Sequence, residues 1–409
     1  MKTNTVLNSA IIGVATLLNA SAAVNTVYIT GSTAFRSQTF LGIKATFDGG
    51  NPQLAARGGS ALDGNNANFM LFHGNVGGVE TFVDCVWSGS EAGVASVAQP
   101  GSHPTYYLKT DGTVAYTITS SNPTSTETNS TPSTSDLAFT DSSQSVSLTP
   151  TPALVPQGAA SPAGAVGVVP FTWAKNKNST PSAAWNRLVN ITDAQARNAL
   201  AGPNVAAAFT GNSADISQYV YCVGRNNGSG TRVNCLAACR YGITKPVDQF
   251  FIGGNPSDGT TLVLTEADAG GNGGYESGGS VAKALGIDGS CQQTDPNFGN
   301  SGWIAIAYLG IGDAKNIGGS GLGQPFWLTL NGVAESNGAI EEGQYNYWNY
   351  ERLYGRVGIS GFAATYGSSL AAAVPTQLGG ANPAANDTSI QLGFMHASKP
   401  SDIGDPFHN

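Results

Sequence analysis

The stretch Arg225-Asn226-Asn227-Gly228-Ser229-Gly230-Thr231 places a fixed positive charge, two hydroxyl groups and an unobstructed backbone within one short loop. Residues 215–223 before it form a β-branched and aromatic run that predicts a strand, and residues 233–241 after it are compatible with a helix. The loop therefore lies at a helix N-terminus, where unpaired backbone N–H groups and the helix dipole favour an anion by about 0.3–1 kcal/mol. Arg225 adds charge-assisted hydrogen bonds. An ordinary turn is the alternative, because the chain contains 54 glycines.

The same order of strand, small-residue turn and helix occurs at two more places. Residues 27–30 lead into Gly31-Ser32-Thr33-Ala34, which opens a predicted helix over residues 35–47. Residues 82–87 lead into Ser88-Gly89-Ser90-Glu91, which opens a second predicted helix. Three helix N-termini that converge on one point can hold a multivalent oxyanion without a metal ion. The sequence therefore predicts neither a metal site nor a cofactor.

These motifs, in this order, resemble those of the phosphate-binding proteins of bacterial ABC phosphate transporters, members of the class II periplasmic binding-protein superfamily. A Gly-x-Thr turn, a Gly-Ser turn, the segment Asp136-Leu137-Ala138-Phe139-Thr140-Asp141 and the Arg-x-x-Gly-Ser-Gly-Thr loop carry the resemblance. Asn227 stands where the family often has Asp. The resemblance implies an α/β, two-lobe periplasmic binding protein type II fold, in which a hinge closes an interlobe cleft on inorganic phosphate. It also implies a set of phosphate-binding residues, namely Thr33, Ala34, Ser90, Asp141, Arg225, Ser229, Gly230 and Thr231.

Asp141 is the residue that distinguishes phosphate from other anions. An ionised carboxylate can only accept hydrogen bonds, so it repels an anion that brings no proton. Phosphate carries a proton near neutral pH and sulfate does not, so Asp141 is expected to accept phosphate and reject sulfate, by as much as several kcal/mol. The alternative is that Asp141 only caps the turn at residues 140–143.

Length and composition limit the class of protein. A chain of 409 residues is long enough for two domains. The expected division places residues 23–160 with residues 340–409 in lobe I, which includes inserts at about 100–134, and residues 161–339 in lobe II. Charged residues make up 11% of the chain, compared with about 25% in typical proteins, and the net charge is −8. This composition argues against a nucleic-acid partner.

Residues 1–22 have the pattern of a cleavable export signal. Lys2 precedes a mostly apolar run over residues 6–18, and Ala20-Ser21-Ala22 offers a cleavage site. A membrane anchor is the alternative, but the apolar run is shorter than the ~20 residues that a span requires. We therefore expect a periplasmic or secreted chain with no lipid-anchor cysteine and no membrane insertion after cleavage.

The five cysteines are expected to form two disulfides and leave one free thiol, since the expected compartment is oxidising. They are Cys85, Cys222, Cys235, Cys239 and Cys291. Metal binding by Cys235 and Cys239 is the alternative, although the sequence places no further ligand near them. The four histidines are scattered singly and suggest no catalytic set.

Several segments interrupt this pattern. Residues 48–68 are rich in Gly and Asn and predict a surface excursion, and residues 106–118 predict a β-hairpin around an Asp-Gly turn. Residues 119–134 are rich in Ser and Thr and predict a mobile loop, or alternatively a partner-binding extension. The Pro-rich residues 148–162 predict the first crossover between the lobes.

In the second lobe, residues 166–175 and 303–309 predict strands, and residues 192–201 predict a helix capped by Thr192. The chain is expected to return to the first lobe near residues 341–348. The aromatic run over residues 344–350 predicts packing between the lobes, with a platform for a ring-shaped ligand as the alternative.

Together these features predict a non-enzymatic, exported protein that captures inorganic phosphate, either for the membrane subunits of an ABC importer or to sequester it. Two other classes remain open. One is a secreted structural or surface-assembly protein that reuses this fold. The other is a phosphate-ester hydrolase, which would require a nucleophile with a base or metal ions.

Overall fold

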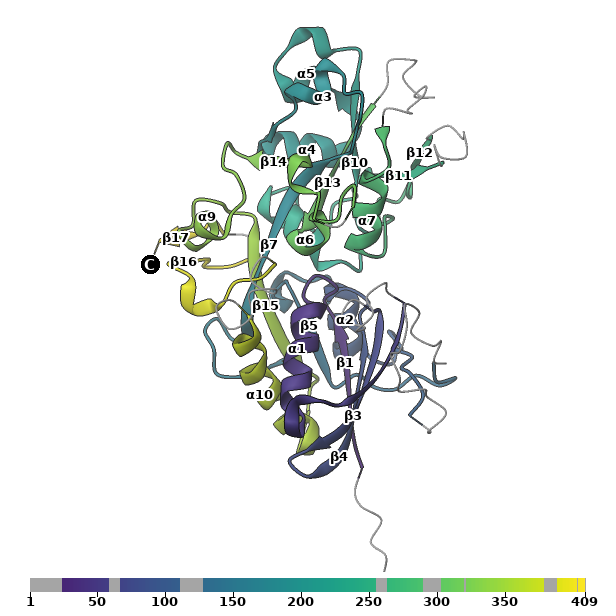
Figure 1. Ribbon diagram of the computed structural model, residues 1–409, viewed down its shortest axis with the longest axis vertical. Coiled ribbons are helices and arrows are strands. Elements are labelled where there is room, and N and C mark those ends of the chain that lie inside the picture. The colour runs from purple at the N-terminus through teal and green to yellow at the C-terminus, as the bar shows by residue number, and fades with distance from the viewer. Residues whose placement is uncertain are drawn as a thin grey trace, which may run out of the picture.

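A mixed β-sheet runs through both halves of the protein. The computed structural model describes residues 24–58, 67–110, 128–254, 263–289, 303–319, 321–378, 388–402 and 404–408. Within these ranges, thirteen strands join in one sheet, and helices pack on its faces (Figure 1). The predicted α/β class is confirmed.

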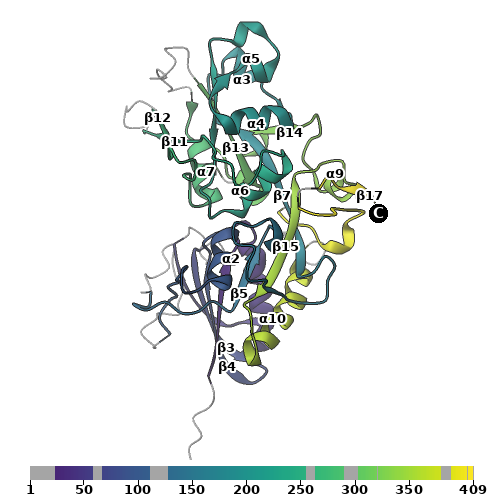
Figure 2. The ribbon, with the colours of Figure 1, turned by 180° about the vertical axis from the view of Figure 1, so that it is seen from behind.

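Two strands connect the lower and upper lobes of Figure 1. They are β7 (Ala165–Lys175) and β15 (Trp348–Gly355), which pair with each other antiparallel. Figure 2 shows the same two strands from behind, where both pass from one lobe toward the other. The pairing shifts register by a bulge between Glu351 and Arg352. Every residue of β7 and of β15 is buried, as expected for strands that are covered on both faces.

The other strands extend the sheet on either side of this pair. In the lower lobe the order outward is β5 (Leu137–Thr140), β1 (Asn25–Gly31), β4 (Val79–Val86), β3 (Phe69–Val76) and β2 (Gln53–Arg57). In the upper lobe it is β13 (Trp303–Gly310), β10 (Tyr219–Val223) and β9 (Asn204–Val205). The short strands β6 (Val155–Pro156), β14 (Trp327–Leu330) and β8 (Asn190–Ile191) branch from this order. Separate two-stranded sheets are formed by β11 (Phe250–Gly253) with β12 (Val263–Glu266) and by β16 (Ala397–Ser398) with β17 (Phe407–His408).

The helices predicted at residues 35–47, after the turn at residues 88–91, at 192–201 and at 233–241 are present and begin within a few residues of the expected positions. In the lower lobe the helices are α1 (Arg36–Thr46), α2 (Ser90–Ala98) and α10 (Gly361–Ala373). The others are α3 (Ala183–Arg187), α4 (Asp193–Ala201), α5 (Ala207–Thr210), α6 (Gly230–Ala238), α7 (Gly278–Leu285), α8 (Ile311–Ala314) and α9 (Asn337–Glu341). Helix α4 confirms the predicted cap, since Thr192 and Gln195 form a capping box. None of the helices described here combines the length and apolar character needed to cross a bilayer.

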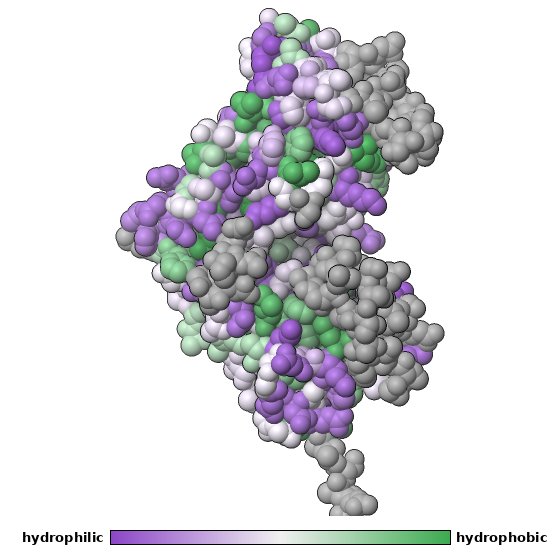
Figure 3. Space-filling model, in the orientation of Figure 1, coloured by the Kyte–Doolittle hydropathy of each residue, from purple (hydrophilic) through white to green (hydrophobic). Residues whose placement is uncertain are grey.

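On the face shown in Figure 3, hydrophilic residues cover most of the lower tip of the molecule, and a hydrophobic patch lies just above it on the lower lobe. The buried hydrophobic side chains instead form a core that spans both lobes, from Val27 and Ile29 to Ile304 and Ile306. Because β7 and β15 contribute Phe171 and Leu353 to this core, the packing is continuous across the two lobes.

Two sequence predictions are corrected by the structure. Residues 48–68 are not only a surface excursion, because residues 53–57 within them form the edge strand β2, whose Ala55 and Ala56 are buried. The two expected disulfides are also wrong. Cys85, Cys222, Cys235 and Cys239 are all free thiols, so the described residues contain no disulfide. Each of the four is buried and packs as a small apolar side chain.

Four predicted features lie partly or wholly outside the described residues. They are the export signal, Cys291, the Asp-Gly turn of the hairpin and most of the Ser/Thr-rich segment. Next to that segment, Leu108 pairs with Thr128 and Thr105 pairs with Ser133.

The close packing of α2 against β1 depends on a glycine. A Cβ atom added at Gly93 would lie 2.5 Å from the Cα atom of Gly31 and 2.9 Å from its backbone nitrogen. We expect Gly93→Ala to lower the free energy of unfolding by about 1–3 kcal/mol, because backbone cannot move aside as a flexible side chain does. Urea denaturation measures the change.

Gly338→Ala is the matched control, since Gly338 lies in helix α9 and an added Cβ meets nothing within 4 Å. We expect it to leave stability unchanged or to raise it by less than about 1 kcal/mol. Equal stability of the two variants would contradict the close approach of α2 to Gly31.

Candidate anion-binding site

Three chain segments meet at one edge of the lower lobe because their strands are parallel. Strand β1 pairs in parallel with β4 and with β5, with Thr30 opposite Val86 and Gly31 opposite Phe139. The carboxyl ends of parallel strands lie at the same edge of a sheet, where ligands commonly bind in α/β proteins. The turn before α1, the turn before α2 and Asp141 therefore come together at this edge.

The predicted loop of the upper lobe contacts this edge. Strand β10 leads into residues 224–229, and α6 begins at Gly230 with Ser229 as its N-cap. The Ala92 N–H donates to the Gly228 carbonyl over 3.2 Å, so the first turn of α2 touches the loop before α6. The N-termini of α2 and α6, which belong to different lobes, are thus neighbours.

Asp141 sits at the centre of this contact. Ser90 Oγ donates to Asp141 Oδ1 over 2.7 Å, and the Asp141 carbonyl accepts from Asn234 Nδ2 over 2.8 Å. A Cβ atom added at Gly230 would lie 1.7 Å from Asp141 Oδ1 and 2.5 Å from Ser90 Oγ. The carboxyl group therefore lies directly against the first residue of α6, where only glycine leaves room for it.

The Asp141 carboxyl titrates near neutral pH in this environment. Its pKa is raised to about 7, mainly by burial and to a lesser extent by the charge of Glu91. The hydrogen bond from Ser90 and the charge of Arg225 act in the opposite direction. Near pH 7 the side chain is present both as an acceptor and as a donor of hydrogen bonds.

Arg225 is buried and held by backbone oxygens. Its Nε donates to the Tyr275 carbonyl over 3.1 Å, and its Nη2 donates to the Glu276 carbonyl over 2.7 Å. Burial lowers its pKa, while the charges of Asp313 and Asp141 favour the charged form. A buried cation is costly unless negative groups compensate it. Arg225 has carboxyl groups nearby, and the N–H groups that do not bond to backbone oxygens can donate to an anion.

The structure brings the predicted residues together to different degrees. Ser90, Asp141 and Gly230 are in direct contact, Ser229 caps α6, and Thr231 is buried in its first turn. Thr33 and Ala34 lie in the half-buried turn before α1. Within the described part of the chain, no hydrogen bond joins these two residues to the others. Ala34 faces the upper lobe, since a Cβ atom added at Gly310 would lie 3.5 Å from its methyl group.

Sequence reasoning missed three residues on or just before β15, one of the two strands that cross between the lobes. Tyr347 precedes β15, and its hydroxyl donates to the Thr231 carbonyl over 3.5 Å, while Asn349 Nδ2 donates to Asn234 Oδ1 over 2.6 Å. Glu351 follows at the same spacing of two, so it lies on the same face of the strand. The aromatic run at residues 344–350 was interpreted as packing between the lobes or as a platform for a ring-shaped ligand. The alternation of Tyr347, Asn349 and Glu351 was the signal for a polar face.

Two further charged residues, Asp313 and Arg36, lie near Arg225. Asp313 follows strand β13 in α8, and its charge favours the charged forms of both Arg36 and Arg225. Arg36 opens α1 in the other lobe and donates from Nη1 to Asn68 Oδ1 over 2.6 Å. Neither Arg36 nor Asp313 belongs to a motif that the sequence analysis singled out.

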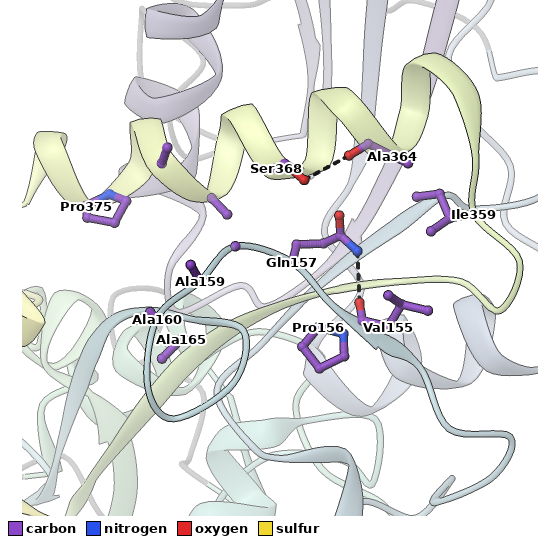
Figure 4. Close-up of a pocket in the computed structure, with 13 residues that line it drawn as sticks. Val155, Pro156, Gln157, Ala159, Ala160, Ala165, Ile359, Ala364, Ser368 and Pro375 are labelled. Atoms are coloured by element: carbon purple, nitrogen blue, oxygen red, sulfur yellow. Dashed lines mark hydrogen bonds between the residues drawn. The ribbon is translucent and has the colours of Figure 1, made fainter.

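A large pocket elsewhere has different chemistry. Figure 4 shows a pocket of about 770 Å³ between residues 155–160 and helix α10, lined mainly by small apolar side chains. Its polar side chains are Gln157, which donates to the Val155 carbonyl, and Ser368, which donates to the Ala364 carbonyl. None of the described residues that line this pocket is charged. Unlike the site around Arg225, its described lining therefore supplies no cation for an anion.

No family model matches the chain, and no curated protein matches it in sequence. Solved structures with a similar fold include a protein of Clostridium perfringens, solved with bound phosphate and described as a phosphate ABC transporter substrate-binding protein. The identity is 12% and the TM-score 0.44, over 90% of this chain and 100% of that one. An ABC-type phosphate transport receptor from Vibrio cholerae is 12% identical, with a TM-score of 0.40 over 86% of this chain and 94% of that one. PstS from Borrelia burgdorferi is 12% identical, with a TM-score of 0.34 over 85% of this chain and 92% of that one.

The raised pKa of Asp141 links stability to pH. Its folded value of about 7 lies above the ordinary value of 3.8, so the folded state binds more protons between these values. We expect the anion-free protein to lose stability as pH rises from about 4 to 7, by at most ~4 kcal/mol from this group. Urea denaturation in buffers free of phosphate and sulfate measures the slope. Asp141→Asn should show a shallower slope, and identical slopes would contradict the burial of the carboxyl group.

The contact at Gly230 generates a second test. We expect Gly230→Ala to lower the free energy of unfolding by about 1–3 kcal/mol, because its methyl group overlaps the Asp141 carboxyl group. Gly228→Ala in the same loop is the matched control, since its nearest atoms would lie at 3.5 Å or more. Urea denaturation of both variants measures the two changes in the free energy of unfolding. A Gly230→Ala variant as stable as Gly228→Ala would mean that the carboxyl group lies elsewhere.

Proposed function

We propose that the protein is an exported, non-enzymatic solute-binding protein that captures inorganic phosphate between two lobes. The contact of Asp141 with Ser90 and Gly230 is the observation that carries the proposal, because it joins the N-termini of α2 and α6 around one titratable group. Lobe I comprises residues 23–160 with residues 340–409, and lobe II comprises residues 161–339. Strands β7 and β15 form the hinge between them.

The phosphate is held by a few neutral donors and one cation. Backbone N–H groups and hydroxyls at three helix N-termini donate to its oxygens, from Thr33, Ala34, Ser90, Ser229, Gly230 and Thr231. Arg225 contributes the positive charge. Micromolar affinity requires about −8.2 kcal/mol, and charge-assisted hydrogen bonds of about 1.5–3 kcal/mol each supply this after the cost of association. The net charge of −8 means that local groups, and not a general positive field, attract the anion.

Asp141 sets the selectivity. In its ionised form it accepts the proton of hydrogen phosphate and repels sulfate, which has none to give. In its protonated form it donates and no longer discriminates. Because its pKa is about 7, rejection of sulfate is expected to be stronger at pH 8 than at pH 6.

The proposed partner and compartment follow from the sequence motifs. The resemblance at the four binding motifs favours delivery of phosphate to the membrane subunits of an ABC importer. The pattern of residues 1–22 favours export, with the mature chain in the periplasm or outside the cell.

Calorimetric titration of the mature chain with phosphate, repeated in excess sulfate, tests the proposal. We expect one-to-one binding at pH 8 that sulfate leaves unchanged, after any bound phosphate has been removed by unfolding and refolding. In Asp141→Asn we expect sulfate to compete at least tenfold better than in the wild type, because a neutral amide donates to either anion. Absence of phosphate binding would rule out this function, and equal competition by sulfate in both proteins would rule out the role of Asp141.

A further inference from the structure

Glu351 is a buried carboxyl group that the proposed site does not use. It lies on β15, fully buried, at the bulge where this strand shifts its pairing with β7. Strand β15 pairs antiparallel with β5, with Arg352 opposite Thr140. The same register continued by one residue places Glu351 opposite Asp141. The crossing strand thus brings a second carboxyl group to the first.

The surroundings of Glu351 are those of the anion site. Ser32, in the turn before α1, interacts with its carboxyl group and favours the charged carboxylate. Neither the Ser32 hydroxyl nor either carboxyl oxygen of Glu351 makes a hydrogen bond of ordinary geometry in the described residues. Two residues earlier on the same face, Asn349 bonds to Asn234, which in turn bonds to the Asp141 carbonyl. Glu351 therefore lies beneath the site and not in a separate part of the core.

Few charges face Glu351. Asp141 on the β5 side disfavours its ionisation, and Arg352 on its own strand favours it only weakly, since Arg352 pairs with Asp402 over 2.8 Å. Strand β7 faces it with residues 165–171, which contain no titratable side chain. In α10 the titratable side chain is Tyr366, which bonds to Thr46. Burial is the largest influence and raises the pKa of Glu351 well above its ordinary value.

We propose that Glu351 is a second carboxyl group of the anion site, which must carry a proton for the anion to bind. This role rests on the proposed phosphate-binding function. A protonated carboxyl group is neutral and can donate to the Ser32 hydroxyl. An ionised one would add a negative charge beside Asp141 and the bound anion, with no partner to compensate it.

The consequence is that phosphate affinity is coupled to a proton on the protein. At low pH the free protein already holds the proton on Glu351. Once the pH exceeds the titration range of that group, binding must take a proton from solvent, and the dissociation constant rises by up to tenfold per pH unit. Titration of phosphate itself and of Asp141 also contributes to the pH dependence, so a comparison between variants is required.

The test is calorimetric titration with inorganic phosphate at pH 6.5 and 9.5 for the wild type and for Glu351→Gln. The measured quantity is the ratio of the two dissociation constants within each protein, which cancels any change in absolute affinity. We expect the ratio to be at least tenfold larger in the wild type, because glutamine has no proton to lose. Equal ratios in the two proteins would overturn the role of Glu351.

Asp84→Asn is the matched control. Asp84 is a fully buried carboxyl group on β4 whose pKa is also raised by burial, but its strand neighbour is Tyr28 and not a residue of the site. Its variant should keep the wild-type ratio. A ratio lowered in Asp84→Asn as much as in Glu351→Gln would show that loss of any buried carboxyl group has this effect, and would overturn the assignment.

Proton uptake provides a measurement that does not require the Glu351 variant to fold. Titration of Asp141→Asn with sulfate at pH 9.5 in buffers of different ionisation enthalpy counts the protons taken up by the protein, because sulfate does not titrate at this pH and Asp141 is absent. We expect close to one proton, and zero would overturn the proposal. If the wild type binds no phosphate at any pH, the proposed function itself fails, whereas binding with equal ratios removes only Glu351 from it.

Discussion

The meeting of a carboxyl group with a helix N-terminus at Gly230 is the constraint on which the rest of the site depends. Asp141 comes from the lower lobe and α6 from the upper lobe, so this contact limits how closely the two halves can approach each other. It requires a residue without a side chain at position 230 and a small hydroxyl residue at position 90. A helix N-terminus stabilises negative charge, and the same N-terminus that tolerates the Asp141 carboxyl group is suited to an external oxyanion. The Asp141 carboxyl group thus lies at the helix N-terminus where the protein is proposed to bind phosphate.

The sequence predicted the segments of the site better than their contacts. The helices α1, α2 and α6 were predicted from small-residue turns after β-branched strands, and they begin within a few residues of the expected positions. The N-cap of α4 at Thr192 was predicted from the sequence because capping is a local interaction, and the structure adds the reciprocal bond of Gln195. Glu351 and Asn349 could not be found in this way, since they reach the site only through antiparallel pairing between β15 and β5, which are far apart in the chain. The edge strand β2 was not predicted, because the Gly and Asn residues on either side of it predict a loop when only the local sequence is considered.

The disulfide prediction failed because a cysteine can be buried as a small apolar residue without forming a bridge. Cysteine count and an expected oxidising compartment suggested bridges, yet burial as small apolar residues satisfies Cys85, Cys222 and Cys235 equally well, and burial raises the pKa of all three thiols. A chain with so few charged residues nevertheless buries several carboxyl groups and guanidinium groups near the lobe boundary. In a chain with few charges, buried carboxyl and guanidinium groups such as Asp141, Glu351 and Arg225 mark positions where the structure departs from what packing alone would select.

The paired strands β7 and β15 also determine what kind of motion the molecule permits. Hydrogen bonds between the two strands resist sliding along their length, whereas a two-stranded ribbon bends readily out of its own plane. The register shift between Glu351 and Arg352 is a local weakness in that ribbon, because a bulge interrupts the ladder and lets a strand kink. Any swing of one lobe relative to the other would therefore concentrate its curvature beside Glu351. The axis of such a motion would then lie beside this buried carboxyl group. A change in the angle between the lobes would change the exposure of the Glu351 carboxyl group to solvent.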